Sequence, residues 1–142
     1  MKRITLILLA ALSLYLLYGV RRGFMDAARH GGSETARERR LAEISKKMNE
    51  GLPRRDGEMT RLEATTVGPG LTFTCLYKFP DHSLAQVDPA KLWAVARSKA
   101  IKAYTNNPVM ADFRKRQVEL HVNYCDKDGN EITTVVVSRN DL

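Results

Sequence analysis

The chain has 142 residues, a formal net charge of +7 and a hydrophobic content of 44%. This length suits one domain, and it excludes two full hydrophobic cores once an apolar N-terminal segment is set aside. Residues 1–60 hold 12 Lys and Arg against 7 Asp and Glu, whereas residues 61–142 hold 11 against 9. Because no zinc-finger spacing, sheet-type RNA motif or helix-turn-helix signal accompanies the charge, we expect no nucleic-acid partner.

Residues 4–20 are almost entirely apolar and carry no charge. As a helix they span about 25 Å, close to the lower limit for a bilayer core of about 30 Å. Arg21 and Arg22 follow this segment, where a cleavable signal peptide has small residues. The sequence therefore predicts an uncleaved membrane anchor over 1–22 with Arg21 and Arg22 at the membrane interface, with a cleaved signal peptide as the alternative.

A flexible basic linker is predicted over 23–32, before a compact domain over 33–142. Both flanks of the anchor are positive, and their Lys and Arg count favours a cytoplasmic domain. The start Lys2-Arg3, followed directly by an apolar run, is nevertheless typical of bacterial export signals. We expect a single-pass protein of the bacterial inner membrane with a periplasmic domain, and a cytoplasmic domain is the alternative.

The domain is predicted to begin with a helix that Ser33 caps and that ends near Glu50. Its apolar positions recur at helical spacing, which favours a helix that packs one apolar stripe on the sheet, with a lipid-facing or partner-binding helix as the alternative. Alternating apolar residues then predict strands over 59–67 and 71–79, joined in a hairpin by Gly68-Pro69-Gly70.

Asp88 and Pro89 are an N-cap and a first helical residue, and they predict a helix to about Asn106. Trp93 lies on its apolar side and is predicted to be core. A short helix is expected over 109–116, and a last hairpin pairs 118–125 with 132–137. The predicted fold class is α+β, in the order anchor, helix-β-β-helix-β-β, with an antiparallel sheet and helices on one face.

No catalytic, cofactor-binding or metal-ligating set is evident. The three histidines lie far apart without metal-ligand spacing, and no nucleophile elbow, phosphate-binding glycine loop or HExxH helix is present. The sequence therefore predicts a protein that is not an enzyme and needs no cofactor.

Cys75 and Cys125 are the only cysteines, and an oxidising periplasm favours their pairing. Cys75 alternates with the apolar residues of its strand, whereas Cys125 alternates with polar ones. Neighbouring strands would place them on opposite faces, so two unpaired thiols are favoured and a Cys75–Cys125 disulfide stays open.

From Lys47 onward the chain resembles a group of small exported bacterial envelope proteins of uncharacterised function. The shared features are Lys47-Met48-Asn49, Leu52-Pro53, Asp56, Thr60-Arg61-Leu62, an aromatic second strand, and the closing hairpin around Tyr124 and Asp126-Lys127-Asp128-Gly129. In that group a cysteine of the middle helix pairs with one at the C-terminus, where this chain has Tyr104 and Asp141-Leu142. The resemblance implies export and a cell-envelope location.

Together these features predict a membrane-anchored, non-enzymatic envelope protein whose partners are the lipid bilayer and another envelope protein. The partner could belong to a secretion assembly or another multi-subunit membrane assembly. The alternative is a small-molecule binding domain or an enzyme with a pocket between sheet and helix. Glu119, His121 and Asn123, on one face of one strand, are its nearest candidate residues.

Overall fold

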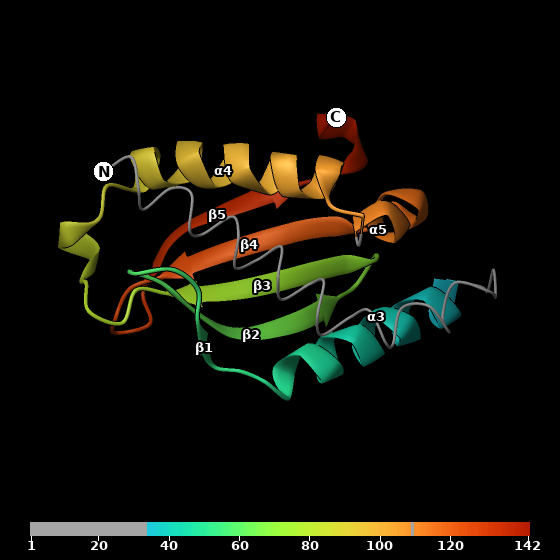
Figure 1. Cartoon of the computed structure of the whole chain (residues 1–142), viewed down its shortest axis with the longest axis horizontal. Helices are drawn as coiled ribbons and strands as arrows, with labels where there is room; N and C mark the ends of the chain where they lie inside the picture. The colour runs from blue at the N-terminus through green and yellow to red at the C-terminus, as the bar shows by residue number, and fades with distance from the viewer. Residues whose placement is uncertain (1–33, 109) are drawn as a thin grey trace.

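The computed structural model describes residues 34–108 and 110–142 (Figure 1). The predicted anchor, Arg21, Arg22 and the linker lie outside these residues. Within the described ranges, no helix has the length and apolar character needed to cross a membrane.

Three α-helices and five strands make up the described domain, which confirms the α+β class. In chain order they are α3 (Glu34–Asn49), β1 (Arg54–Arg55), β2 (Arg61–Gly68), β3 (Thr72–Lys78), α4 (Pro89–Asn106), α5 (Met110–Arg116), β4 (Glu119–Cys125) and β5 (Glu131–Val137). Two short 3-10 turns, η1 (Leu84–Gln86) and η2 (Arg139–Asp141), precede α4 and end the chain. All the predicted helices and strands of the domain are present, and the two-residue β1 is additional.

The five strands form one sheet in the order β1-β2-β3-β4-β5. Both predicted hairpins are confirmed, because β2 pairs antiparallel with β3 and β4 pairs antiparallel with β5. The prediction of a fully antiparallel sheet is wrong, since β3 and β4 are parallel. The cause is the helical connection between them: α4 and α5 return the chain to the end of the sheet where β3 began, so β4 runs in the same direction.

One face of the sheet carries the core, and the helices pack on that face (Figure 1). The strand register aligns Phe73 with Leu120 and Val137, and all three side chains are buried. Tyr104 of α4 and Phe113 of α5 belong to the same buried cluster. Alternation along β3 and β4 therefore predicted correctly which side chains face the helices.

α4 begins as the sequence predicts, with the Asp88 carboxylate accepting hydrogen bonds from the backbone N–H groups of Ala90 and Lys91. The prediction that Trp93 is a core residue is wrong, because Trp93 is 44% exposed. The buried side chains of α4 are Ala96, Ala100, Ala103 and Tyr104. They all lie after Trp93, so only the part of the helix beyond its first turn covers the core.

Hydrogen bonds to the buried Thr65 fasten α3 to β2. Asn49 donates from Nδ2 to the Thr65 carbonyl at 2.8 Å, and its Oδ1 accepts from the Thr65 N–H at 2.7 Å. Ser45 adds a hydrogen bond from its hydroxyl to the same carbonyl, also at 2.8 Å. Because Thr65 is buried, its backbone groups depend on these side chains.

Asn49→Ala is expected to lower the free energy of unfolding by about 1–3 kcal/mol, because it leaves the buried Thr65 N–H without its acceptor. Chemical denaturation followed by circular dichroism measures the change. Lys47→Ala, an exposed position in the same turn, is the matched control and should stay within about 0.5 kcal/mol of the wild type. Equal effects of the two substitutions would contradict the structural role of Asn49.

The turn of the last hairpin is fixed by Asp126. Its carboxylate accepts from the backbone N–H groups of Asp128 at 2.9 Å and Asn130 at 2.8 Å, and from the Leu84 N–H at 3.1 Å. These backbone hydrogen bonds lower the pKa of Asp126 although burial opposes them. One carboxylate thereby joins the hairpin to the loop before α4.

Candidate functional site

The two cysteines are free thiols on opposite faces of the sheet. Cys75 lies on the helix-covered face of β3, beside Val122. Cys125 is beside Lys78 at the end of β4, and its Sγ donates to the Tyr77 carbonyl at 3.3 Å. The structure therefore keeps Cys75 and Cys125 apart, although the sequence had left a disulfide between them open.

Neither thiol is prepared for nucleophilic chemistry. Burial raises the pKa of Cys75 to about 12, with a smaller contribution from the charge of Asp56. Burial also raises the pKa of Cys125, and the nearby Lys78 only partly opposes it. A catalytic cysteine needs a lowered pKa so that the thiolate is present near neutral pH. Burial therefore disfavours the reactive thiolate form of both residues.

A buried titratable group that the sequence did not single out as a site is Asp56, in the loop between β1 and β2. It is 6% exposed, and its carboxylate accepts a hydrogen bond from the Tyr77 hydroxyl. Its Oδ1 has no hydrogen-bond partner among the described residues. Burial raises the pKa of Asp56, while the Tyr77 hydrogen bond and the charges of Arg54 and Lys99 lower it. A turn-rich connector in the sequence gives no signal that one of its carboxylates is buried.

The raised pKa of Asp56 makes a testable contribution to stability. The folded state holds this proton more tightly than the unfolded state, so the contribution is fully present below the ordinary pKa of 3.8. It is lost as the pH rises through the folded-state pKa. We expect Asp56→Asn to gain stability relative to the wild type as the pH rises from acid to neutral, measured by urea unfolding across that range. If the free energies of unfolding of the two proteins changed in parallel with pH, folding would not raise the pKa of Asp56.

The face of the sheet opposite the helices carries the candidate binding surface. Leu76, Asn123 and Thr134 lie side by side on it across β3, β4 and β5, and Thr74, His121 and Val136 form the next row. Leu76 is 37% and Val136 40% exposed. No helix of the described residues packs on this face (Figure 1). We call these six residues the bare sheet face.

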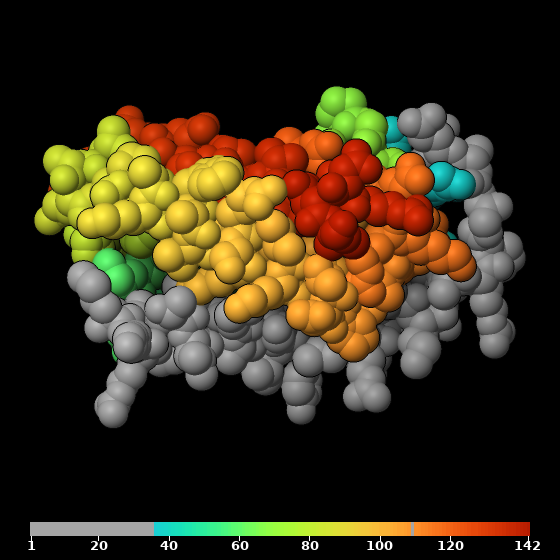
Figure 2. Space-filling view, turned by 90° about the horizontal axis from the view of Figure 1, so that it is seen from above, coloured from blue at the N-terminus to red at the C-terminus, as the bar shows by residue number. Residues whose placement is uncertain are grey.

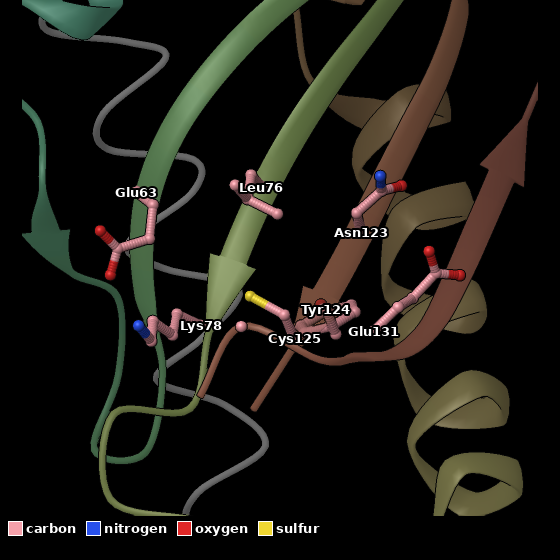
Figure 3. A pocket seen from close by; sticks show the side chains of 8 residues that line it. Glu63, Leu76, Lys78, Asn123, Tyr124, Cys125 and Glu131 are labelled. Carbon is pink, nitrogen blue, oxygen red and sulfur yellow. The ribbon is translucent and has the colours of Figure 1, made fainter. Parts of the chain in front are cut away.

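An open hollow of about 370 Å³ adjoins the bare sheet face at the end of β3 and β4 (Figure 3). Carboxylates from β2 and β5 lie on either side of it, and the Lys78 amine and Cys125 thiol lie between them. Asn123 contributes a buried Oδ1 without a hydrogen-bond partner among the described residues. The full lining is Glu63, Leu76, Lys78, Asn123, Tyr124, Cys125, Gly129 and Glu131.

The candidate residues for a small-molecule pocket all belong to this outer face. Glu119 and His121 meet directly, with Glu119 Oε1 and His121 Nε2 2.5 Å apart, and Asn123 is two residues further along β4. They do not line a pocket between sheet and helix, because they project from the face that the helices leave open. Over residues 34–108 and 110–142, no three or more His, Cys, Asp or Glu side chains are grouped to hold a metal ion.

Three more exposed apolar side chains belong to α4 and η1. Trp93 and Val95 of α4 and Leu84 of η1 are each more than two-fifths exposed. The Arg97 guanidinium lies 5.6 Å from the centre of the Trp93 ring and binds Asp141 of η2 at 2.9 Å. Figure 2 shows α4 and the C-terminal turn side by side.

Comparison with known proteins gives structural relatives only. No family model matches the sequence. No curated protein matches it either. The fold matches a "putative secreted protein" from Pseudomonas aeruginosa with a TM-score of 0.63 and 16% identity, over 78% of this chain and 97% of that one.

The fold also matches the pilotin EpsS of the Vibrio vulnificus type 2 secretion system, with a TM-score of 0.59 and 13% identity, over 75% of this chain and 92% of that one. Neither description names an enzymatic activity. At these identities the likeness concerns the fold, and at that level it confirms the resemblance to small exported bacterial proteins. The chain thus shares its fold with a protein described as secreted and with a secretion-system pilotin.

Proposed function

We propose that this chain is a non-enzymatic accessory protein of the bacterial cell envelope that binds another protein of a secretion assembly or a similar membrane assembly. The fold shared with a pilotin supports this proposal. The chemistry of the two thiols agrees with it, since burial raises the pKa of both. The proposed binding surface is the bare sheet face.

The observation that carries the proposal is the exposure of Leu76 and Val136 on a sheet face that no described helix covers. An open sheet face that leaves apolar side chains in water offers apolar area that a partner can bury. Here Asn123, Thr134 and His121 surround the two apolar side chains and supply hydrogen-bonding groups. A partner that covers this face would remove the apolar side chains from water.

The test is purification of the tagged full chain from its native membranes in a mild detergent. We expect one envelope protein to co-purify with the chain in a stoichiometric complex. When that protein is tagged instead, we expect the chain to co-purify with it. Purification of the chain alone, from intact membranes at its native abundance, would contradict the proposal.

The proposed location is the inner membrane, with residues 1–22 as the anchor and the domain in the periplasm. The support comes from the apolar run 4–20 and the arginines that follow it. Paired reporters fused after Leu142, one active only in the periplasm and one only in the cytoplasm, test the orientation. Activity of the cytoplasmic reporter alone would contradict a periplasmic domain.

A further inference from the structure

The two edges of the sheet differ in how they are protected. At the β2 edge, β1 pairs with part of the strand, and Asn49 of α3 binds both backbone groups of Thr65. β5 forms the other edge, and no strand of the described residues pairs with its outer side. From Glu131 to Val137 it contains no proline or lysine, the residues that commonly protect a free edge. β5 is therefore the open edge of the sheet.

The backbone of β4 alternates between its two neighbouring strands. At its start the Glu119 N–H donates to the Leu71 carbonyl at 3.0 Å, and at its end the Cys125 carbonyl accepts from the Phe79 N–H at 2.9 Å. Because the backbone groups of successive strand residues point to opposite sides, the odd-numbered residues of β4 bind β3. The even-numbered residues therefore bind their partners in β5, which are Thr133, Val135 and Val137.

Thr134 and Val136 lie between these partners, so their N–H and C=O groups point away from β4 to the open edge. Val136 is also 40% exposed. The next outward residue, Ser138, finds its partners within the chain. Its N–H donates to the Asp141 carboxylate at 2.8 Å, and its carbonyl accepts from the Asp141 N–H at 3.1 Å. The open edge thus offers two backbone donors and two acceptors, at Thr134 and Val136.

α4 lies along the helix side of this edge. It packs mainly on β5, and Figure 1 shows it on the β5 side of the sheet. Trp93 projects from the same side of α4 as the buried Ala96, Ala100 and Tyr104, because these residues recur at helical spacing. Its ring is nevertheless 44% exposed. A strand added beside β5 would lie on this side of α4 and would shield the ring from water.

The position of α4 excludes a second copy of the chain at this edge. Two β5 strands paired antiparallel would be related by a twofold axis perpendicular to the sheet, which would place both α4 helices on one face. The paired strands would lie about 4.8 Å apart, but packed helices need about 8–10 Å between their axes. Because each α4 packs on its own β5, the two helices would collide. An extended segment of another protein brings no such helix.

We propose that the envelope partner adds an extended segment to β5 as a further strand, with its main chain paired to Thr134 and Val136. Such pairing uses all four backbone groups of the open edge, and alternate side chains of the segment would face α4 and the bare sheet face. Thr134 and Val136 already belong to the bare sheet face, so the added strand would extend the same surface. This inference rests on the proposed function, because it specifies how the partner binds.

Residue-resolved amide hydrogen exchange tests the pairing on the full chain in detergent, alone and in complex with the co-purified envelope protein. In the chain alone we expect slow exchange at Val135, whose N–H binds β4, and fast exchange at Thr134 and Val136. In the complex, exchange at Thr134 and Val136 should slow by at least about tenfold.

Fast exchange of Thr134 and Val136 in the complex would overturn the inference while the proposed function stands. Slow exchange of both in the chain alone would also overturn it, because another part of the chain or a second copy would already occupy the edge. Absence of any complex, by contrast, would contradict the proposed function itself.

Two substitutions at position 136 separate main-chain pairing from side-chain contact. Val136→Pro keeps an apolar side chain and removes the outward N–H, a change that an edge strand tolerates. Val136→Thr keeps the N–H and makes the side chain polar. In a titration with the purified partner, we expect Val136→Pro to weaken the affinity at least about tenfold more than Val136→Thr.

An equal or reversed order of the two affinities would overturn the inference and assign binding to the side chains of the bare sheet face alone. Unchanged urea unfolding of each variant verifies that the domain is intact. If Val136→Pro unfolds the domain, the hydrogen-exchange measurement decides between strand addition and side-chain contact.

Discussion

Phe73→Ala is expected to lower the free energy of unfolding by about 3–5 kcal/mol, the usual cost of removing a fully buried aromatic side chain. Phe73 is 1% exposed in the central strand β3. Its ring packs edge-on against Phe113 of α5, with ring centres 5.3 Å apart, so the substitution also removes an aromatic contact. Since domains of this size are stable by about 5–15 kcal/mol in total, the loss should shift the urea midpoint strongly.

Leu76→Ala is the matched control for this substitution. Leu76 lies on the same strand, but its side chain projects from the bare sheet face and makes no part of the buried cluster. We expect it to cost less than about 1 kcal/mol. A small effect of Phe73→Ala, or similar effects at the two positions, would contradict the assignment of the two faces of β3.

Leu76→Glu is expected to weaken binding of the envelope partner by at least about tenfold, which corresponds to about 1.4 kcal/mol. The substitution places a carboxylate on the bare sheet face, where a partner that covers this face would have to remove it from water. Because Leu76 is exposed in the free domain, stability should change little. Affinity for the purified partner, measured by titration in detergent, gives the result.

Val95→Glu provides the comparison for Leu76→Glu, since it makes the same chemical change at an exposed apolar position on α4. It lies on the helical side of the sheet and should leave partner affinity unchanged. If Val95→Glu weakened binding and Leu76→Glu did not, the binding surface would lie on the helices.

Local patterns predicted most of the described elements. Alternation along β3 and β4 separates Phe73 and Leu120 from Leu76 and Asn123, because successive residues of a strand face opposite sides. The Asp88-Pro89 pair predicts the start of α4, since one residue caps the helix and the other cannot donate within it. The resemblance to exported proteins agreed with the fold comparison, although it had rested on short motifs.

The remaining features depend on contacts between distant parts of the chain. The parallel pairing of β3 with β4 follows from the path of α4 and α5 across the sheet, which no local pattern specifies. Trp93 was wrongly predicted to be a core residue. The spacing of apolar residues indicates which side of a helix a residue lies on, but it does not indicate how far the core extends along the helix. The burial of Asp56 likewise requires Tyr77, which lies on another strand. The openness of the sheet face follows from the placement of three helices on the other side.

The measurement that tests the central claim most directly is site-specific photo-crosslinking in living cells. A photoreactive amino acid at position 76 samples the bare sheet face, and the same group at position 95 samples the opposite side of the domain. The account predicts an adduct with one envelope protein from position 76 and its absence from position 95. Absence of a protein adduct from position 76, in cells where the chain is present at its native level, would contradict the account.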